Sequence, residues 1–285
     1  MLGRCTFPPP GTEVDCAVSG GADSLALLVL AVESGCRATA HHVDHGLRPG
    51  SAAEADVVAA AAARFGAGFR SVRVTVEPGP NLEARARASR YAALPAGVLT
   101  GHTADDQAET VVLNVLRGAG LDGLGGMGPE RHPLLGIRRS ETRGLCRELG
   151  LDWVEDPTNT DPAHLRNRVR AEVLPLLDGV AGRDVVAVLA RQANVLRDDA
   201  ALLDALAAAI DPTDATALVA APTPLARRAV RAWLSGLRGP NAMDAHPPDQ
   251  ATVERVLAVA RGEARATDIG GGRRVVRSHQ RLRQE

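Results

Sequence analysis

Short apolar runs and longer helix-forming segments alternate along the first part of the chain. The runs are a few residues long and need not alternate with polar residues, as expected for strands that are covered on both faces. The predicted strands cover residues 14–19, 37–43, 69–76 and 97–100, and the predicted helices cover residues 23–34, 51–65, 81–94 and 104–117. This rhythm of strands and helices predicts an α/β fold with a doubly wound parallel sheet.

The alternation ends after the fourth predicted helix. A glycine-rich passage at 118–128 predicts a loop near the functional site. Further helices are predicted at 140–149, with Ser140 as cap, and at 164–177, 184–210, 224–237 and 249–261, followed by a hairpin at 266–277. We therefore expect a catalytic domain at 1–180 and a smaller, mainly helical domain at 181–285.

The loop between the first predicted strand and helix has the sequence Ser19-Gly20-Gly21-Ala22-Asp23-Ser24. Gly20 and Gly21 can adopt backbone angles that other residues avoid, and they let a ligand approach the main chain closely. Asp23 or Ser24 is the expected helix cap, and the free N–H groups of a helix start attract anions. An ordinary glycine turn is the alternative, but the strand–loop–helix context favours a phosphate site.

The composition limits both the core and the chemistry. Of the 285 residues, 45% are hydrophobic but only 2% are aromatic, so Ala, Val and Leu must build the core. The net charge of −1 gives no overall attraction to nucleic acid, so RNA would have to meet a local basic patch. All 33 Lys+Arg residues are arginines, which excludes a Walker-type lysine, a pyridoxal Schiff base and a covalent adenylyl-lysine.

Cysteine usage and the absence of long apolar runs indicate where the protein works. Cys5, Cys16, Cys36 and Cys146 show neither a CxxC pair nor metal-ligand spacing, so buried, reduced thiols are expected. The N-terminal sequence lacks the apolar core of a signal peptide, and no apolar run approaches the ~18 residues of a membrane span. We therefore expect a cytoplasmic protein without membrane contact.

Three of the eight histidines, His41, His42 and His45, lie with Asp44 at the end of the second predicted strand. His and Asp are common metal ligands, so a structural metal is one alternative. Adjacent residues of a strand point to opposite faces, however, and His41 and His42 cannot both face one ion without a bend. We favour a wall of the substrate or nucleotide site, and a solvated strand end is the remaining alternative.

The segment 101–110 carries a pair of carboxylates at a predicted helix start. Thr103 can cap the helix, whose dipole favours acidic residues in the first turn, and capping alone would explain much of the pattern. Asp106 and Glu109 are three residues apart and therefore share one helix face. At the carboxyl end of a strand such a pair could hold Mg²⁺ or an ammonium group. Arg117, near the far end of the helix, would complement the dipole or reach a phosphate.

A basic run of Arg166, Arg168 and Arg170 follows the string DPTNTDPAHL. Such a run is often a solvated helix face. Arginine is also the preferred partner of phosphate groups, so contact with an RNA backbone is the competing interpretation. Arg166 and Arg170 are four residues apart and share one helix face.

Several of these strings resemble one enzyme family. SGGADS is similar to the pyrophosphate-binding loop of the ATP-pyrophosphatase (PP-loop) superfamily, whose members cleave ATP to AMP and pyrophosphate. The strings that resemble the tRNA(Ile)-lysidine synthetase family, in its order, are SGGADS, HHVDHGLR, NLEARARASRYAAL, GHTADDQAETVVLNVLRGAG, HPLL and DPTNTDPAHLRNRVR. The resemblance covers roughly residues 12–177, and the C-terminal part matches only weakly.

The resemblance implies an ATP-dependent carbon–nitrogen ligase. Such enzymes adenylate C2 of the wobble cytidine in the CAU anticodon of tRNA(Ile), and the amine of free lysine then displaces AMP. The expected ATP-binding residues are Ser19, Gly20, Gly21, Ala22, Asp23, Ser24 and His45, with Asp23 also on the Mg²⁺ side. The expected catalytic residues are Asp23, Asp106 and Glu109, of which Asp106 and Glu109 receive lysine. The expected tRNA contacts are Arg117, Arg166, Arg168 and Arg170.

Other functions stay open at the level of the sequence. A tRNA thiolation enzyme is the alternative within the superfamily, although similar enzymes often use CxxC chemistry, which this chain lacks. A metal-dependent phosphoesterase built on the histidine segment and a non-catalytic RNA-binding protein are alternatives from other classes. The sequence does not fix the oligomeric state, and a homodimer is one alternative.

Overall fold

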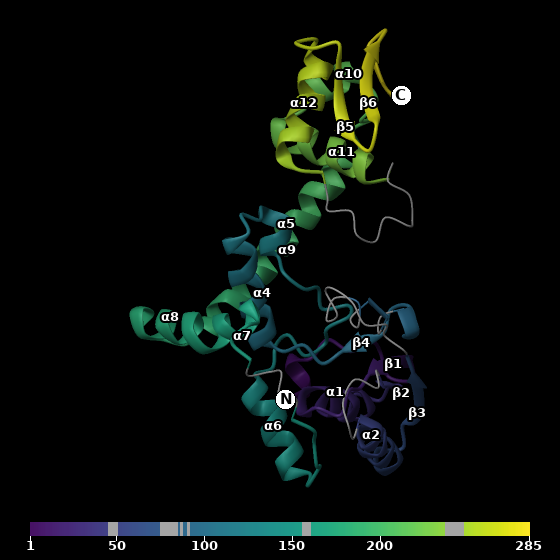
Figure 1. Ribbon diagram of the computed structural model, residues 1–285, viewed down its shortest axis with the longest axis vertical. Coiled ribbons are helices and arrows are strands. Elements are labelled where there is room, and N and C mark those ends of the chain that lie inside the picture. Colours follow the sequence, from purple (N-terminus) through teal and green to yellow (C-terminus); the bar gives the residue numbers. More distant parts are fainter. Residues whose placement is uncertain (45–50, 75–84, 86–87, 90–91, 156–160, 237–247) are drawn as a thin grey trace. The chain divides into compact units, whose positions relative to one another are not determined.

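The computed structural model describes residues 1–44, 51–74, 85, 88–89, 92–155, 161–236 and 248–285. The chain divides into two compact units, Met1–Arg197 and Asp198–Glu285 (Figure 1). The division lies within helix α9 (Val185–Ala207). The predicted boundary between residues 180 and 181 falls in the last turn of helix α8 (Leu174–Ala181), and it stays a prediction about functional domains.

The first unit is built on a four-stranded parallel sheet. Its strands are β1 (Glu13–Ala17), β2 (Arg37–Asp44), β3 (Gly68–Arg73) and β4 (Leu99–Thr100), in the order β3-β2-β1-β4. All three neighbouring pairs are parallel, which confirms the α/β fold expected from the sequence. The strand order reverses at β1, between β2 and β4, and sheets of this kind bind ligands beyond the carboxyl ends of the strands at such a point.

Helices connect and cover these strands. The first are α1 (Ala22–Glu33) and α2 (Ser51–Phe65), followed by α4 (Ala104–Leu116), the short α5 (Leu121–Leu124) and α6 (Arg139–Glu148). Helix α7 (Leu165–Arg168) continues through a π-helical turn, Val169–Val173, into α8. The helix predicted at 81–94 lies largely outside the described residues.

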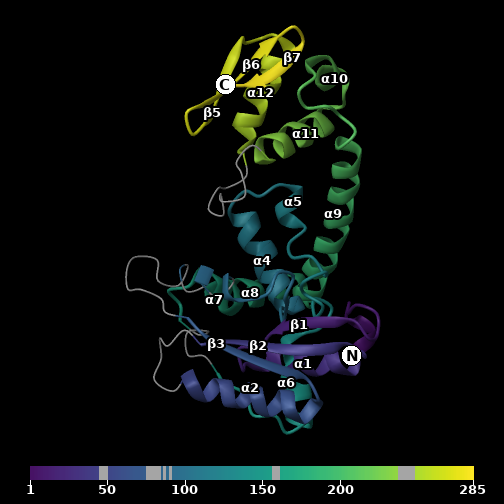
Figure 2. The ribbon, with the colours of Figure 1, turned by 90° about the vertical axis from the view of Figure 1, so that its right-hand side faces the viewer.

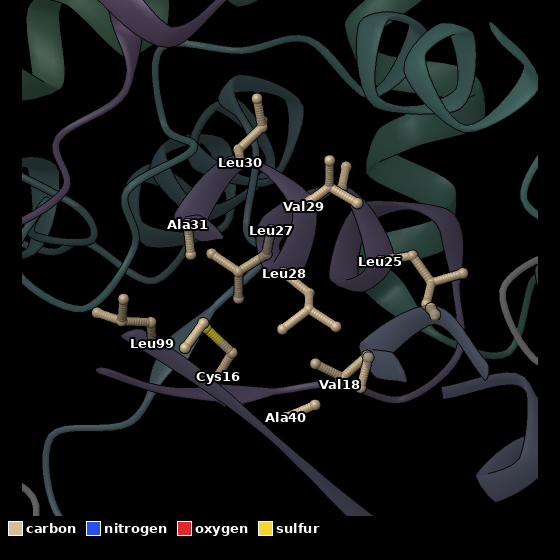
Figure 3. Packing of buried hydrophobic residues seen from close by; sticks show 14 of the residues in the cluster. Cys16, Val18, Leu25, Leu27, Leu28, Val29, Leu30, Ala31, Ala40 and Leu99 are labelled. Atoms are coloured by element: carbon tan, nitrogen blue, oxygen red, sulfur yellow. The ribbon is translucent and has the colours of Figure 1, made fainter. Parts of the chain in front are cut away.

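The core of the first unit lies between helix α1 and the sheet. Leu25, Leu27 and Leu28 of α1 are fully buried, and Leu27 and Leu28 point toward apolar residues of the strands, among them Cys16 (Figure 3). A helix that is apolar on almost every side must be covered all round. Helices α2 and α6 supply this cover, since they lie beside α1 on the same side of the sheet (Figure 2).

The second unit packs helices against a small antiparallel sheet. The helices are α10 (Ala215–Ala220), α11 (Thr223–Gly236) and α12 (Gln250–Arg261), and the sheet has the order β5 (Ala266–Gly270), β6 (Arg273–Ser278), β7 (Arg281–Gln284). The predicted hairpin is confirmed and extended by β7. The turn between β6 and β7 contains His279 and Gln280, both with positive φ (47° and 62°). Such turns are usually marked by Asn-Gly or Asp-Gly, and neither dipeptide is present at this turn.

Two local predictions are wrong. Helix α6 begins at Arg139, and its cap is Arg138 rather than Ser140. The backbone N–H of Arg138 donates to the carboxylate of Glu141 at 3.0 Å, which is why the helix starts earlier. The glycine-rich passage, predicted as a loop, contains the helical turn α5.

The cysteines are reduced, as predicted. All four are free, and Cys16, Cys36 and Cys146 are buried. Burial raises the pKa of the Cys16 thiol to about 12 and that of the Cys146 thiol to about 11, so both stay protonated at neutral pH. In the described part of the chain, no helix is both long enough and apolar enough to cross a membrane.

The packing of α1 predicts where the fold is most sensitive. The change Leu28→Ala should lower the free energy of unfolding by about 2–5 kcal/mol, because it opens a cavity in a fully buried layer. The matched control is Leu116→Ala, since Leu116 is 64% exposed and its removal should cost less than about 0.5 kcal/mol. Urea unfolding at neutral pH measures both changes, and equal losses would contradict this account of the core.

Candidate functional site

Two loops meet where the order of the strands reverses. Residues 19–24 follow β1, and residues 101–103 follow β4, its neighbour in the sheet. A Cβ atom added to Gly101 would lie 2.5 Å from the carbonyl oxygen of Asp23, closer than the two atoms can approach. Gly101 therefore packs directly against the backbone of Asp23, and only a residue without a side chain fits there.

The first loop leaves the start of α1 open. Gly20 has φ of +89°, a conformation that favours glycine, and Gly21 is the N-cap of α1. No side chain of the described residues caps this helix, so the predicted capping by Asp23 or Ser24 is wrong. The hydroxyl of Ser24 instead donates to the carbonyl of Gly21 at 2.8 Å and lies 3.2 Å from the backbone N–H of Ser19, which donates to it. The N–H groups at the helix start thus remain available to an anion.

The histidines at the end of β2 make different contacts, as the geometry of a strand predicted. His41 Nε2 lies 2.7 Å from a carboxylate oxygen of Asp15. His42 is 2% exposed, and its Nδ1 donates to the carbonyl of Val18 at 3.0 Å, which leaves Nε2 as an acceptor. Within the described residues, this buried Nε2 has no hydrogen-bond partner, and the ring is held beside the first loop through Val18, the residue that precedes that loop. His45 lies outside the described residues.

Helix α4 places two carboxylates beside the loops. Thr103 is its N-cap, as predicted, and Asp106 Oδ2 accepts hydrogen bonds from the Thr103 backbone N–H at 2.9 Å and from its hydroxyl at 2.8 Å. Glu109 has no exposed side-chain surface. A buried carboxylate needs a cation or several donors nearby, because burial without them is costly.

One guanidinium supplies a cation to both carboxylates and to the first loop. Arg139, the first residue of α6, lies 2.8 Å from Asp106, 3.2 Å from Glu109 and 3.5 Å from Asp23. Its side chain is only 17% exposed. The hydroxyl of Thr142, one turn further along α6, donates to Asp23 as well. Carboxylates from α1 and α4 therefore meet at the start of α6.

Two further arginines surround Glu109. Arg170 makes a two-point contact, with Nε 2.7 Å from Oε1 and Nη2 3.2 Å from Oε2. Arg166 Nε lies 3.1 Å from Oε2 without the alignment of a hydrogen bond, and its Nη2 donates to the hydroxyl of Thr110 at 2.7 Å. Arg166 and Arg170 thus share one face, as predicted, but that face meets α4.

The charges of this cluster shift the pKa values in opposite directions. Burial raises the pKa of Asp23, and the nearby Asp106 carboxylate adds to this, although hydrogen bonds from Thr142 and Arg139 oppose it. Burial acts in the same direction on Asp106, but Arg139, His102 and Thr103 outweigh it and lower the pKa of Asp106. Asp106 is therefore firmly ionised, whereas Asp23 accepts a proton more readily than an ordinary aspartate.

The structure brings together only part of the residues selected from the sequence. Asp23, Asp106, Glu109, Arg166 and Arg170 form one cluster around Arg139. The other two predicted tRNA contacts lie outside this cluster. Arg117 is the C-cap of α4. Arg168 is 54% exposed and forms an ion pair with Glu172 at 3.0 Å.

The sequence alone does not single out Arg139 and Thr142 as site residues. Both follow the string HPLL, at or next to the segment 140–149, for which the pattern predicts only a short helix. A signal was present, because two carboxylates on one helix face require cations from elsewhere in the chain once that face is buried. The sequence does not say which of the 33 arginines supplies them.

Comparison with known proteins identifies both units. The PP-loop domain family matches residues 5–177, and the TilS substrate binding domain matches residues 214–283. The chain is 44% identical to the tRNA(Ile)-lysidine synthase of Nocardia farcinica over 285 residues, which cover 93% of this chain and 88% of the relative. It is 47% identical to the tRNA(Ile)-lysidine synthase of Mycolicibacterium paratuberculosis over 234 residues, which cover 76% and 73%.

A solved structure agrees with the fold. The U34-tRNA thiolase NcsA from Methanococcus maripaludis is similar with a TM-score of 0.50 and 18% sequence identity, over 67% of this chain and 73% of that one. At this identity the likeness concerns the fold alone, and it supports the parallel α/β architecture.

The raised pKa of Asp23 predicts that this residue costs stability. The change Asp23→Asn should raise the free energy of unfolding at pH 7, because the ionised carboxylate is disfavoured by burial. A carboxyl group whose pKa is raised by folding contributes stability at low pH, and this contribution is lost as the pH rises through the pKa of the folded state. The difference in the free energy of unfolding between Asp23→Asn and the wild type should therefore shrink as the pH is lowered. Urea unfolding between pH 3.5 and about 7 measures this. A variant that is less stable than the wild type at pH 7 would contradict it.

Proposed function

We propose, because the chain belongs to the tRNA(Ile)-lysidine synthase family, that its site joins free lysine to the wobble cytidine of tRNA(Ile) with cleavage of ATP. The chain is a PP-loop, ATP-using ligase of tRNA modification. The proposal concerns the chemistry at the ends of β1 and β4. The observation that carries it is the meeting of Asp23, Asp106 and Glu109 around one buried guanidinium.

The first loop and the start of α1 are the proposed phosphate site. The uncapped N–H groups of the helix and the left-handed Gly20 suit a phosphate chain that approaches the backbone. His42 Nε2, buried beside the loop, suits a hydrogen-bond donor on the nucleotide. The cytidine oxygen would attack the α-phosphate, and the loop N–H groups would stabilise the charge that develops on departing pyrophosphate.

Asp23 is the proposed side chain for Mg²⁺. In the described part of the chain, no three His, Cys, Asp or Glu side chains are placed so that they could hold a metal ion by themselves. Mg²⁺ is commonly held by one or two carboxylates together with substrate phosphates and water. When bound, Mg²⁺ would neutralise phosphate charge, and Asp23 would be held ready for it by the hydroxyl of Thr142 and by Arg139.

Asp106 and Glu109 are the proposed seat of lysine. They lie on one buried face of α4, and the lowered pKa of Asp106 keeps its charge. The charges of Asp23, Asp106 and Glu109 are matched by Arg139, Arg166 and Arg170, so an incoming ammonium would share these carboxylates or displace one guanidinium. The cluster would thereby be sensitive to the charge of the substrate as well as to its shape.

Arginines of both units are the proposed tRNA contacts. The predicted set of Arg117, Arg166, Arg168 and Arg170 stays a prediction, and of these Arg117 and Arg168 are exposed. The second unit matches a substrate binding domain and carries arginines on β6 and β7. Phosphate contacts of this kind position tRNA without reading its sequence. A tRNA substrate also supports a cytoplasmic site of action, and the homodimer stays a prediction.

The thiolation alternative has less support. Its chemistry often uses paired cysteines, whereas the four cysteines of this chain are free and three of them are buried. The likeness to a thiolase structure concerns only the fold.

The proposed reaction is tested with purified full chain, ATP, Mg²⁺, lysine and a tRNA(Ile) transcript with a CAU anticodon. We expect AMP and pyrophosphate in equal amounts with a lysine-modified tRNA, which mass spectrometry of the anticodon fragment identifies. The variant Asp23→Ala should release no pyrophosphate, while circular dichroism shows it folded. Product without lysine, or with a sulfur source instead, would overturn the proposal.

The lysine seat predicts unequal effects on the two small substrates. Glu109→Gln should raise the KM for lysine by about tenfold or more, because a charge-assisted hydrogen bond contributes about 1.5–3 kcal/mol, and should change the KM for ATP little. The control is Asp105→Asn on the same helix, which weakens an ion pair with Arg138 at 3.1 Å and retains a side-chain oxygen for the Arg139 backbone N–H. Equal changes in both KM values, or the same change in the control, would contradict a lysine role for Glu109.

A further inference from the structure

A cluster of three polar side chains lies at the end of β4, next to the site and outside the roles assigned so far. Thr100 Oγ1 lies 2.6 Å from Nδ1 of His102 and 2.6 Å from Nδ1 of His132. The two Nδ1 atoms are 3.1 Å apart, and the rings meet edge to face with centroids 4.8 Å apart. Thr100 is 7% exposed.

These distances restrict where the protons can be. If both Nδ1 atoms lacked a proton, the single hydroxyl proton of Thr100 could serve only one of them, and the remaining lone pairs would repel. If both carried a proton, the two N–H groups would oppose each other. The arrangement that satisfies all three side chains has the proton of one histidine on Nδ1, donating to Thr100. The hydroxyl of Thr100 then donates to the other Nδ1 at 2.6 Å rather than to the carbonyl of Arg131 at 3.5 Å. The three side chains form a continuous hydrogen-bonded chain with a direction.

The direction that places the proton on His102 Nδ1 gives His102 a basic Nε2. A neutral imidazole carries only one ring proton, so the other nitrogen keeps its lone pair. His132 and Thr100 then fix the tautomer and orientation of His102, as the partner of a general base does in other enzymes. In this arrangement His102 is the candidate general base, and Thr100 and His132 are the groups that orient it.

The chain places His102 between the two halves of the site. The preceding residue, Gly101, packs on the backbone of Asp23, and the following residue, Thr103, binds the Asp106 carboxylate through its N–H and hydroxyl. The titratable groups that face His102 include His132 from the 129–137 loop and Asp106 from α4. The backbone N–H of Thr100 donates to the carbonyl of Arg131 at 2.9 Å, which holds His132 in place.

We propose that His102 takes the proton from the amine that attacks the activated cytidine, and that Thr100 and His132 orient it. This inference rests on the proposed function. Lysine arrives with its side-chain amine protonated, since its ordinary pKa is about 10.4, and an ammonium has no lone pair for attack. Histidine has an ordinary pKa of about 6.5 and can accept a proton near neutral pH.

The step balances without a further reactant. The ammonium gives one proton to His102 Nε2, and the freed electron pair forms the bond from nitrogen to C2 of the cytidine. The bond from C2 to the bridging oxygen breaks, and its electrons leave with AMP. The imidazolium returns its proton to solvent, either directly or by passing the Nδ1 proton through Thr100 to His132.

The hydroxyl of Thr100 offers a test with a closely matched control. Thr100→Val keeps the shape of the side chain and removes the hydroxyl, whereas Thr100→Ser keeps the hydroxyl. Two rates are measured separately for the full chain: formation of adenylated tRNA without lysine, and its conversion on addition of lysine. The ratio of the lysine-dependent rate to the adenylation rate should fall by about 10²-fold or more in His102→Asn. It should also fall measurably in Thr100→Val, and it should stay near the wild-type value in Thr100→Ser.

The pH and the nucleophile give a second measurement that a structural role would not change. The defect of His102→Asn should become smaller with rising pH and with S-(2-aminoethyl)cysteine in place of lysine, because both increase the fraction of unprotonated amine. If the two rates fall together in His102→Asn, or if neither pH nor nucleophile reduces the defect, the pair only holds the 129–137 loop and the proposal is overturned. If the wild type itself makes no lysine-modified tRNA, the proposed function fails instead.

Discussion

Asp23, Asp106 and Glu109 depend on the guanidinium of Arg139, because three carboxylates cannot share a buried site without a cation between them. Arg139 belongs to α6, while the carboxylates belong to α1 and α4. The contact therefore fixes three helices at the carboxyl ends of β1 and β4. Burial alone would lower the pKa of Arg139, but the carboxylates of Asp106, Glu109 and Asp23 raise it, so the cation persists at every physiological pH.

The close approach of the two loops is the second constraint. Gly101 touches the backbone of Asp23, which brings α4 within reach of the first loop, and Gly20 bends that loop so that the start of α1 stays uncapped. The first loop and the carboxylates of α4 lie beside each other because β1 and β4 are neighbours in the sheet although they are far apart in the sequence.

The charge balance of the cluster separates two roles for acidic residues. Asp106 is kept ionised by Arg139, His102 and its own helix cap, although burial opposes this. Burial raises the pKa of Asp23, and the hydrogen bonds from Thr142 and Arg139 only partly oppose this. Two carboxylates of the same type thus differ because cations and donors outweigh burial at Asp106, whereas burial outweighs them at Asp23.

The sequence by itself determined the parallel α/β class, the loop at 19–24, the cap at Thr103 and the shared face of Asp106 and Glu109. These features depend on spacing along a few neighbouring residues, and the family resemblance depends on short strings of the same kind. The cap of α1 was predicted wrongly because Ser24 binds the backbone of its own loop instead.

Only the tertiary structure decided which distant residues meet. Arg139 reaches Asp23 across 116 positions of sequence, and His102 reaches His132 through Thr100, contacts that no periodicity encodes. The face of Arg166 and Arg170 was predictable, but its partner was not, since a helix face shared by two arginines looks the same whether it meets water, phosphate or Glu109. The physical reason is that ion pairs depend on three-dimensional proximity, which chain spacing fixes only within a helix or a strand.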